Sequence, residues 1–257
     1  MNETENQLLL LGIDTPSTWI IYNEMVQRFG AFPALIENPA SRRKLLVNRV
    51  KKLGFLAVLS QMAFVIFLRP WIRLNSRKRI LFLKRTLGLE TAMPMSDYFH
   101  QVDNVNGPQA HALLSKFRPK IIIVNGTRIL SRKTLDHIGG VIINTHQGIT
   151  PAYRGAYGAY WALFNNDKAN CGITIHLVDE GIDTGNILAQ ARILPEAEDN
   201  FVTYAYLQSA AAFEPLAKAI KDAKAGKLQS YPISGQSKVW YHPGFLQYLS
   251  GAIRGVR

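Results

Sequence analysis

The sequence lacks several features that commonly indicate a function. It holds one cysteine, Cys171, in 257 residues, which excludes an internal disulfide framework and a cysteine-rich metal site and suits a reducing compartment. The opening segment lacks the dinucleotide fingerprint G-x-G-x-x-G, and a Walker A sequence is absent throughout, so dinucleotide and P-loop nucleotide binding have no support. Residues 1–7 carry two Glu and no basic residue, unlike a secretory signal peptide.

The chain also lacks an uncharged apolar run of transmembrane length. The longest such run, residues 53–68, has sixteen residues and includes Ser60 and Gln61. A spanning helix needs about 20 apolar residues. We therefore expect a buried helix or a helix in a dimer interface, with a helix lying in a membrane surface as an alternative, rather than a transmembrane span.

Acidic residues are missing from residues 38–89, which hold thirteen Lys or Arg. The formal net charge is +12, yet the rest of the chain carries 17 basic and 18 acidic residues. The basicity therefore belongs to one segment and is not a nucleic-acid-binding signature of the whole protein.

Alternating apolar strands and amphipathic helices predict an α/β fold with a mostly parallel sheet. Residues 40–86 read as two helices broken near Arg69-Pro70, and Asp199 is expected to cap a long helix that ends near residue 225. We predict a catalytic domain at 1–195 with a helical insertion at about 40–89, and a helical C-terminal extension at 196–257 that packs on it. Strands are expected at 8–13, 34–37, 98–105, 120–124, 141–144, 172–178 and 187–194.

Polar residues end the strand predicted at 141–144. Asn144 and His146 are two residues apart, so on an extended segment they share a face. An amide N–H can stabilise an oxyanion, and an imidazole can move a nucleophile's proton. The pair suits attack on a carbonyl, although a polar strand end with a structurally bonded histidine is the alternative.

Two further loops follow predicted strands. Residues 179–185 contain three acids and two glycines, so a carboxylate there can orient His146, or the segment is an ordinary acidic turn. Its acids do not fit EF-hand spacing, which argues against calcium. Residues 125–131 form a small irregular loop whose backbone groups suit the edge of a flat heterocycle, with a plain strand-to-helix turn as the alternative.

Together these motifs resemble the folate-dependent formyltransferase family. The resemblance rests on Asn144-x-His146, on residues 148–155 (GITPAYRG) and on residues 181–185 (GIDTG), and it spans about residues 95–195. It implies a Rossmann-like formyltransferase core, the cofactor 10-formyltetrahydrofolate and no metal. Gly148 replaces the usual Ser of the family, and Ile149-Thr150 replaces the usual Leu-Leu.

The resemblance also implies roles for individual residues. Asn144 would hold the formyl oxygen, His146 would act as general base or acid, and Asp183 would orient His146 and help move protons. His176 is expected to support these three residues, with substrate binding as the alternative. The residues implied in cofactor binding are Arg128, Ile129, Leu130, Val141, Val178, Asp179, Glu180 and Ile182.

The family acts on several substrates, and we expect an enzyme that formylates the primary amine of a nucleotide-linked amino sugar for surface polysaccharide. Methionyl-tRNA formyltransferase carries a C-terminal β-barrel, whereas the residues after 195 read mostly as helix. Formylation of methionyl-tRNA or another amine is the alternative, and a non-catalytic membrane-surface protein is the second. The residues expected to approach the sugar are Tyr153, Arg154, Tyr157 and Trp161.

We expect a cytoplasmic enzyme without a nucleic-acid partner. Residues 40–89 combine an apolar stretch with basic residues on both sides. That combination suits contact with the inner, anionic face of a membrane. A homodimer interface with a basic rim is an equal alternative.

Overall fold

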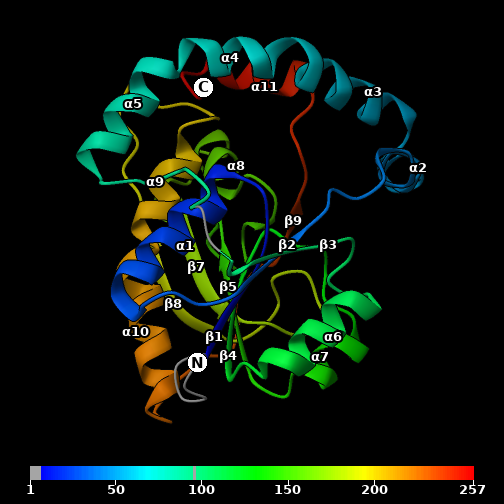
Figure 1. Ribbon diagram of the computed structural model, residues 1–257. Coiled ribbons are helices and arrows are strands. Elements are labelled where there is room, and N and C mark those ends of the chain that lie inside the picture. The colour runs from blue at the N-terminus through cyan, green and yellow to red at the C-terminus, as the bar shows by residue number, and fades with distance from the viewer. Residues whose placement is uncertain (1–6, 95–96) are drawn as a thin grey trace.

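A seven-stranded sheet forms the centre of the computed structural model, which describes residues 7–94 and 97–257. Its strand order is β3-β2-β1-β4-β5-β7-β8; the first five strands are parallel, whereas β7 is antiparallel to both of its neighbours (Figure 1). The prediction of a mostly parallel α/β sheet is confirmed. The strands are β1 (Leu8–Ile13), β2 (Ala34–Glu37), β3 (Phe99–Val102), β4 (Ile121–Asn125), β5 (Val141–His146), β7 (Gly172–Leu177) and β8 (Ile187–Arg192).

Helices cover both faces of the sheet (Figure 1). Helices α1 (Pro16–Phe29) and α10 (Phe213–Lys224) bury side chains in one apolar cluster with Ile123 of β4. Helices α6 (Pro108–Phe117) and α7 (Arg132–Ile138) pack in the cluster on the other face. The strands are apolar on both faces because both are covered, which is typical of parallel sheets.

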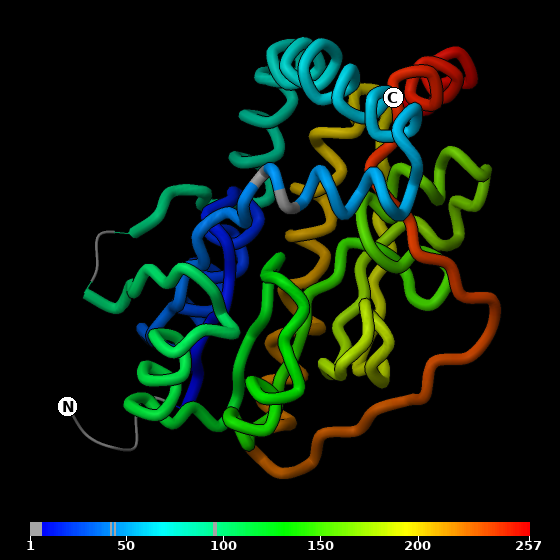
Figure 2. The backbone as a smooth tube through the Cα atoms, turned by 90° about the vertical axis from the view of Figure 1, so that its right-hand side faces the viewer, coloured from blue at the N-terminus to red at the C-terminus, as the bar shows by residue number. Residues whose placement is uncertain are grey.

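The insertion is a chain of helices that crosses the end of the molecule beyond the carboxyl ends of the parallel strands (Figures 1 and 2). Its first break is at Gly54, whose φ of +84° suits glycine, and its second is at Ser76. Its elements are α2 (Arg42–Leu53), α3 (Phe55–Ala63), the π-helical turn η1 (Phe64–Leu68), α4 (Arg69–Asn75) and α5 (Arg77–Thr86).

The predicted break near Arg69-Pro70 is wrong. The helix continues from Phe55 to Asn75 because a π-helical turn precedes the proline, and the Arg69 N–H bonds to the Phe64 carbonyl five residues back. Proline lacks an N–H and crowds the carbonyl four residues before it, and the wider turn relieves that crowding.

Of the two forms expected for this apolar run, the buried helix is wrong, whereas a helix in a dimer interface stays a prediction. The continuous helix has 21 residues, and 22% of its most apolar 18-residue window is buried. By length and composition it is long enough to cross a membrane, since it extends past the sixteen-residue run read from the sequence.

The region after β8 differs from the single capped helix that we predicted. Helix α9 (Tyr204–Ala211) and α10 are separated at Ala212, because the ring of Pro215 would crowd the Ala211 carbonyl in a continuous helix. Asp199 does not cap α9; its carboxylate bonds to Arg79 of the insertion at 2.8 and 2.9 Å.

The C-terminal tail returns to both the core and the insertion. Strand β9 (Val239–Trp240) pairs in parallel with β6 (Arg154–Gly155). Helix α11 (Phe245–Ile253) then packs against α3 and η1. A short helix, α8 (Gly158–Phe164), and the 3₁₀ turn η2 (Lys168–Asn170) complete the elements between β6 and β7.

Candidate active site

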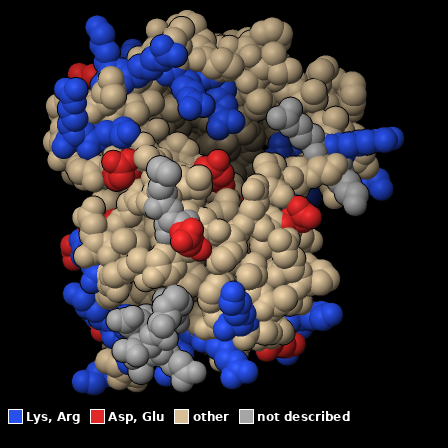
Figure 3. All heavy atoms as spheres, in the orientation of Figure 1, with Lys and Arg blue, Asp and Glu red and all other residues tan. Residues whose placement is uncertain are grey.

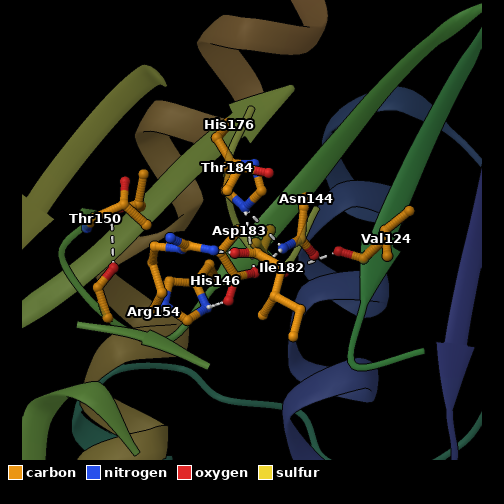
Figure 4. A network of polar contacts seen from close by, with 12 residues as sticks. Val124, Asn144, His146, Thr150, Arg154, His176, Ile182, Asp183 and Thr184 are labelled. Carbon is orange, nitrogen blue, oxygen red and sulfur yellow. Dashed lines mark hydrogen bonds and ion pairs between the residues drawn. The ribbon is translucent and has the colours of Figure 1, made fainter. Parts of the chain in front are cut away.

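Four polar side chains meet at the end of β5 (Figure 4). Asn144 and His146 belong to β5 itself, which extends two residues beyond the strand that we predicted. His176 stands opposite Asn144 on β7, and Asp183 lies in the loop that follows β7. The structure thus brings together the three residues implied in catalysis and the histidine expected to support them.

His176 fixes the amide of Asn144. Its Nδ1 lies 2.7 Å from the Leu177 carbonyl, which can only accept, so Nδ1 carries the proton. Its Nε2 therefore accepts a hydrogen bond from Asn144 Nδ2 at 2.9 Å. The second N–H of the amide points to Asp183 Oδ1 at 3.3 Å, so the amide presents its donors toward the centre of the cluster.

His146 is buried, with 5% of its side chain exposed. Its Nε2 donates to the Tyr153 carbonyl at 2.7 Å, again because the carbonyl can only accept. Its Nδ1 lies 3.2 Å from Asp183 Oδ2. With the ring proton on Nε2, no proton lies between Nδ1 and Oδ2. A single added proton would form a hydrogen bond between these two atoms.

Asp183 is held in place by backbone as well as by side chains. The Gly155 N–H donates to its Oδ2 at 2.8 Å. Its φ of +50° lies in the left-handed region, where Asp is better tolerated than most residues. Burial raises its pKa, but the charge of His146, the contact with His176 and the Gly155 N–H outweigh burial and hold the pKa below its usual value.

The pKa of His146 is lowered. Burial lowers it by more than the Asp183 carboxylate and the Tyr153 carbonyl raise it. At neutral pH the pair therefore holds a neutral imidazole beside an ionised carboxylate. This is the protonation state of a general base, able to accept a proton from an attacking group.

The turn after His146 explains one departure from the family pattern. A Cβ at Gly148 would lie 2.2 Å from the Tyr153 carbonyl oxygen and 2.7 Å from His146 Nε2. A side chain there would therefore disrupt the hydrogen bond that orients the imidazole. Thr174 of β7 anchors this turn: its hydroxyl donates to the Gly148 carbonyl and accepts from the Thr150 N–H.

Two of the loops implied in cofactor binding lie side by side. Leu130 and Val178 share one apolar cluster, and Arg132 pairs with Glu180 at 2.6 Å across the two loops. Between them the apolar side chain of Ile129 is 54% exposed. An exposed apolar side chain beside irregular backbone fits one face of a flat heterocycle.

Other residues implied in cofactor binding are engaged elsewhere. The Arg128 guanidinium lies 3.2 Å from Glu37 and donates to the Asn38 carbonyl, at the end of β2. Val141 begins β5, beside Ile121 and packed on the core, and is not brought to the cluster at the other end of the strand. Asp179 accepts from the Gly181 N–H and the Thr184 hydroxyl, and Ile182 offers its carbonyl to Arg154.

The residues expected to approach the sugar divide into two groups. Arg154 stays at the site and donates to the Ile182 carbonyl at 2.7 Å and to Ser237 at 2.6 Å. Tyr157 is partly buried and stacks on Phe201.

The side chains of Tyr153 and Trp161 do not reach the site, contrary to the expectation. They are 4% exposed and pack with Trp240. Tyr153 ends the turn before β6, and its ring stacks on Trp240 while its hydroxyl donates to Asp167 at 2.9 Å.

Two functional contacts were not predicted from the sequence. They are the Tyr153 carbonyl bound to His146 and the Gly155 N–H bound to Asp183. Both are backbone groups, which no residue type signals. Within the residues that the structure describes, no group of His, Cys, Asp and Glu is arranged to hold a metal ion.

Known proteins resemble the chain in two ways. Residues 91–215 match a family described as Formyl transferase. Methionyl-tRNA formyltransferase of Finegoldia magna is 37% identical over 91 residues, covering 35% of this chain and 29% of that protein. The chain spans less than half the length of the curated relatives that it matches.

The fold itself is shared with solved structures. A sugar N-formyltransferase from a Shewanella species has a TM-score of 0.58 at 14% identity, covering 91% of this chain and 76% of that one. HypX from Aquifex aeolicus, in complex with tetrahydrofolic acid, has a TM-score of 0.55 at 13% identity, covering 92% and 30%. The Rossmann-like fold that the resemblance implied is confirmed.

Proposed function

We propose, from the match of residues 91–215 to a family described as Formyl transferase, that the protein is an enzyme that transfers a formyl group from 10-formyltetrahydrofolate to a primary amine. One observation carries the proposal: Asn144, His146 and Asp183 meet at the end of β5, where Asn144 donates to Asp183 at 3.3 Å and His146 Nδ1 lies 3.2 Å from the Asp183 carboxylate. The cofactor fits beside this cluster, where the loops containing Ile129 and Val178 meet. When bound, it supplies an activated formyl carbon that an amine can attack.

The residues of the cluster have distinct roles in this reaction. The His146–Asp183 pair accepts a proton from the amine as the new C–N bond forms, and returns it to the departing nitrogen as the old C–N bond breaks. The N–H of Asn144 that points to Asp183 Oδ1 at 3.3 Å would be donated instead to the formyl oxygen, where negative charge develops. His176 acts as a positioning residue, because it holds the amide without facing the reacting atoms.

For the substrate we favour the primary amine of a nucleotide-linked amino sugar used in surface polysaccharide. The similarity to sugar N-formyltransferases supports this choice, although it is one of fold. Arg154 lies beside Asp183 and suits a phosphate group. We propose that the reaction takes place in the cytoplasm, at the inner face of the membrane.

Methionyl-tRNA is the second candidate substrate, because the curated relatives are methionyl-tRNA formyltransferases. Against it, the residues after 195 fold here into α9, α10, β9 and α11 rather than a β-barrel. The basic residues, moreover, are concentrated in the insertion and not in the core.

The test is formyl transfer from 10-formyltetrahydrofolate to a panel of nucleotide-linked amino sugars and, in parallel, to initiator methionyl-tRNA. We expect turnover with at least one sugar and its loss in His146→Ala. The matched control is His137→Ala, an exposed histidine on α7. Much faster formylation of the tRNA than of any sugar would refute the sugar substrate, and full turnover by His146→Ala would refute the mechanism.

A further inference from the structure

The outer face of the Phe55–Asn75 helix is the largest feature that the formyl-transfer site does not use. Its inner face is buried through Val58, Phe64 and Ile72. The opposite face presents large apolar side chains to the exterior, each at least 51% exposed: Phe55, Leu56, Leu59, Ile66, Phe67, Trp71 and Leu74. Monomeric soluble proteins rarely expose contiguous apolar area of this kind without an interaction partner.

A second helix at the same end of the molecule has the same property. Helix α11 packs against α3 and η1, and both views place it beside the insertion (Figures 1 and 2). Its exposed apolar residues are Leu246, Leu249 and Ile253, at 72%, 37% and 88%. These residues and the outer face of the Phe55–Asn75 helix are together called the apolar platform below.

Basic residues border the apolar platform. In Figure 3, Lys and Arg gather over α4 and α5 on one side and near α2 on the other, with a largely uncharged top edge between them. Residues 38–89 hold thirteen Lys or Arg and no acid, and residues 223–257 hold no acid either. An apolar face with a basic border matches the chemistry of an anionic lipid surface.

We propose that the apolar platform docks on an anionic lipid bilayer, with the Phe55–Asn75 helix lying in the plane of the membrane surface. The polar contacts of its inner face argue against insertion across the bilayer. Gln61 donates to the His242 carbonyl at 2.8 Å, and Ser60 accepts from the Phe245 N–H at 3.0 Å. A spanning orientation would break these contacts and expose both polar side chains to lipid, which is costly.

The charges disfavour a second copy of the chain as the occupant. A twofold contact places the same patch on both subunits. The basic borders would then face each other, and neither the insertion nor the tail after residue 223 offers a carboxylate to offset them. An anionic headgroup layer offsets them directly. Docking in this way would turn the carboxyl edge of the sheet, and with it the candidate active site, toward the membrane.

The test is cosedimentation of the full chain with phosphatidylcholine vesicles that contain or lack phosphatidylglycerol. We expect binding to the anionic vesicles, weakened by salt. Trp71 is 62% exposed whereas Trp19 and Trp161 are buried, so binding should also shift the tryptophan emission to shorter wavelength, and Trp71→Phe should remove most of that shift.

Three variants separate the contributions. Leu56→Ser with Phe67→Ser should weaken binding about tenfold or more, because two large apolar side chains no longer enter the interface. Neutralising three of the basic residues that border the apolar platform should weaken vesicle binding about 100-fold. Neutralising three exposed lysines on other helices should leave vesicle binding unchanged. The border variant combines Arg73→Gln, Arg77→Gln and Lys78→Gln, and the control variant combines Lys116→Gln, Lys133→Gln and Lys224→Gln.

Three results would overturn the proposal. The first is equal binding to neutral vesicles or no binding to either kind. The second is unchanged vesicle binding both in Leu56→Ser with Phe67→Ser and in the variant that neutralises Arg73, Arg77 and Lys78. The third is a stable dimer in solution that Leu56→Ser with Phe67→Ser dissociates, which would assign the apolar platform to a second copy. None of these measurements depends on formyl transfer, so failure here is distinct from failure of the proposed activity.

Discussion

The cluster at the end of β5 and the apolar platform above it differ in where their partners lie. In the cluster, His146, His176 and Asp183 each contact other groups of the same chain. On the platform, large apolar side chains face outward while the helix rests on the core through Phe64 and Ile72. The polar side chains of the first region find their partners within the molecule, whereas the second region lacks a partner of matching area and charge within the described residues.

Charge separates the two regions as well. The residues outside 38–89 are nearly balanced, with 17 basic and 18 acidic, and the insertion is wholly basic. The net charge of +12 therefore arises from the region that we propose docks on the membrane, and not from the region that holds the polar cluster. If this division is correct, changes in one region should leave the function of the other intact.

The largest expected effect is on catalysis. His146→Ala removes the imidazole that faces Asp183 through Nδ1, and we expect kcat to fall by about 10²- to 10⁴-fold, the usual contribution of a general base. Steady-state formyl transfer measures it. Vesicle binding should be unchanged, and loss of both properties together would show that the two regions are not separable.

The second prediction concerns the link between the regions. Arg79 of α5 pairs with Asp199, whose side chain is fully buried. Arg79→Met leaves a buried carboxylate without its counter-charge, which should lower the free energy of unfolding by about 3–5 kcal/mol in urea titrations. The double variant Arg79→Met, Asp199→Leu should recover much of the loss, because no charge is then buried.

The same pair predicts a pH dependence of stability. Burial raises the pKa of Asp199, but its hydrogen bonds with Arg79, the Glu196 N–H and the Thr203 hydroxyl, together with the Arg79 charge, outweigh burial, so the folded-state pKa is lowered. A lowered carboxyl pKa contributes stability that is fully present above the unfolded value of about 3.9 and is lost as the pH falls below it. A loss below 1 kcal/mol in Arg79→Met, or one independent of pH in this range, would contradict the pairing.

The third prediction is the acid limit of the reaction. Because burial lowers the pKa of His146, the imidazole should stay able to accept a proton at pH values below the ordinary histidine pKa of about 6.5. The acid limb of kcat/KM should therefore lie below that value and fall about tenfold per pH unit. A limb at or above 6.5 would show that His146 is not the titrating base.

A smaller effect is expected at His176. His176→Ala removes the acceptor that holds Asn144 Nδ2, and the loss of one hydrogen bond should lower kcat about tenfold with little change in KM. His176→Gln offers an acceptor again and should restore part of the rate. A change confined to KM would instead place His176 in substrate binding.

The sequence predicted the parts of the site that depend on strand geometry. Asn144 and His146 share a face because side chains alternate on extended backbone, and the acidic loop follows the neighbouring strand of the same sheet. The errors arise where long-range packing decides. Tyr153 and Trp161 turn into an aromatic cluster completed by Trp240, some 80 residues further along the chain.

The course of the insertion was beyond prediction for a similar reason. Pro70 predicts a break, yet one π-helical turn accommodates it and extends the apolar helix. Asp199 precedes a helix and resembles a cap, but a basic side chain more than a hundred residues earlier in the chain binds it instead. The spacing of nearby residues predicts neither the π-helical turn nor the Arg79–Asp199 pair, since each depends on contacts made in the folded protein.

The smallest expected effect completes the comparison. Leu56→Ser, Ile66→Ser and Phe67→Ser, each on the outer face, should change the free energy of unfolding by less than about 0.5 kcal/mol without lipid, because solvent already covers those side chains. Phe64→Ala on the inner face of the same helix should cost about 3–5 kcal/mol, since that ring is fully buried. Urea unfolding of the four variants measures both. Outer-face losses as large as the Phe64→Ala loss would mean that another protein surface already covers the platform in solution, leaving no face for a membrane.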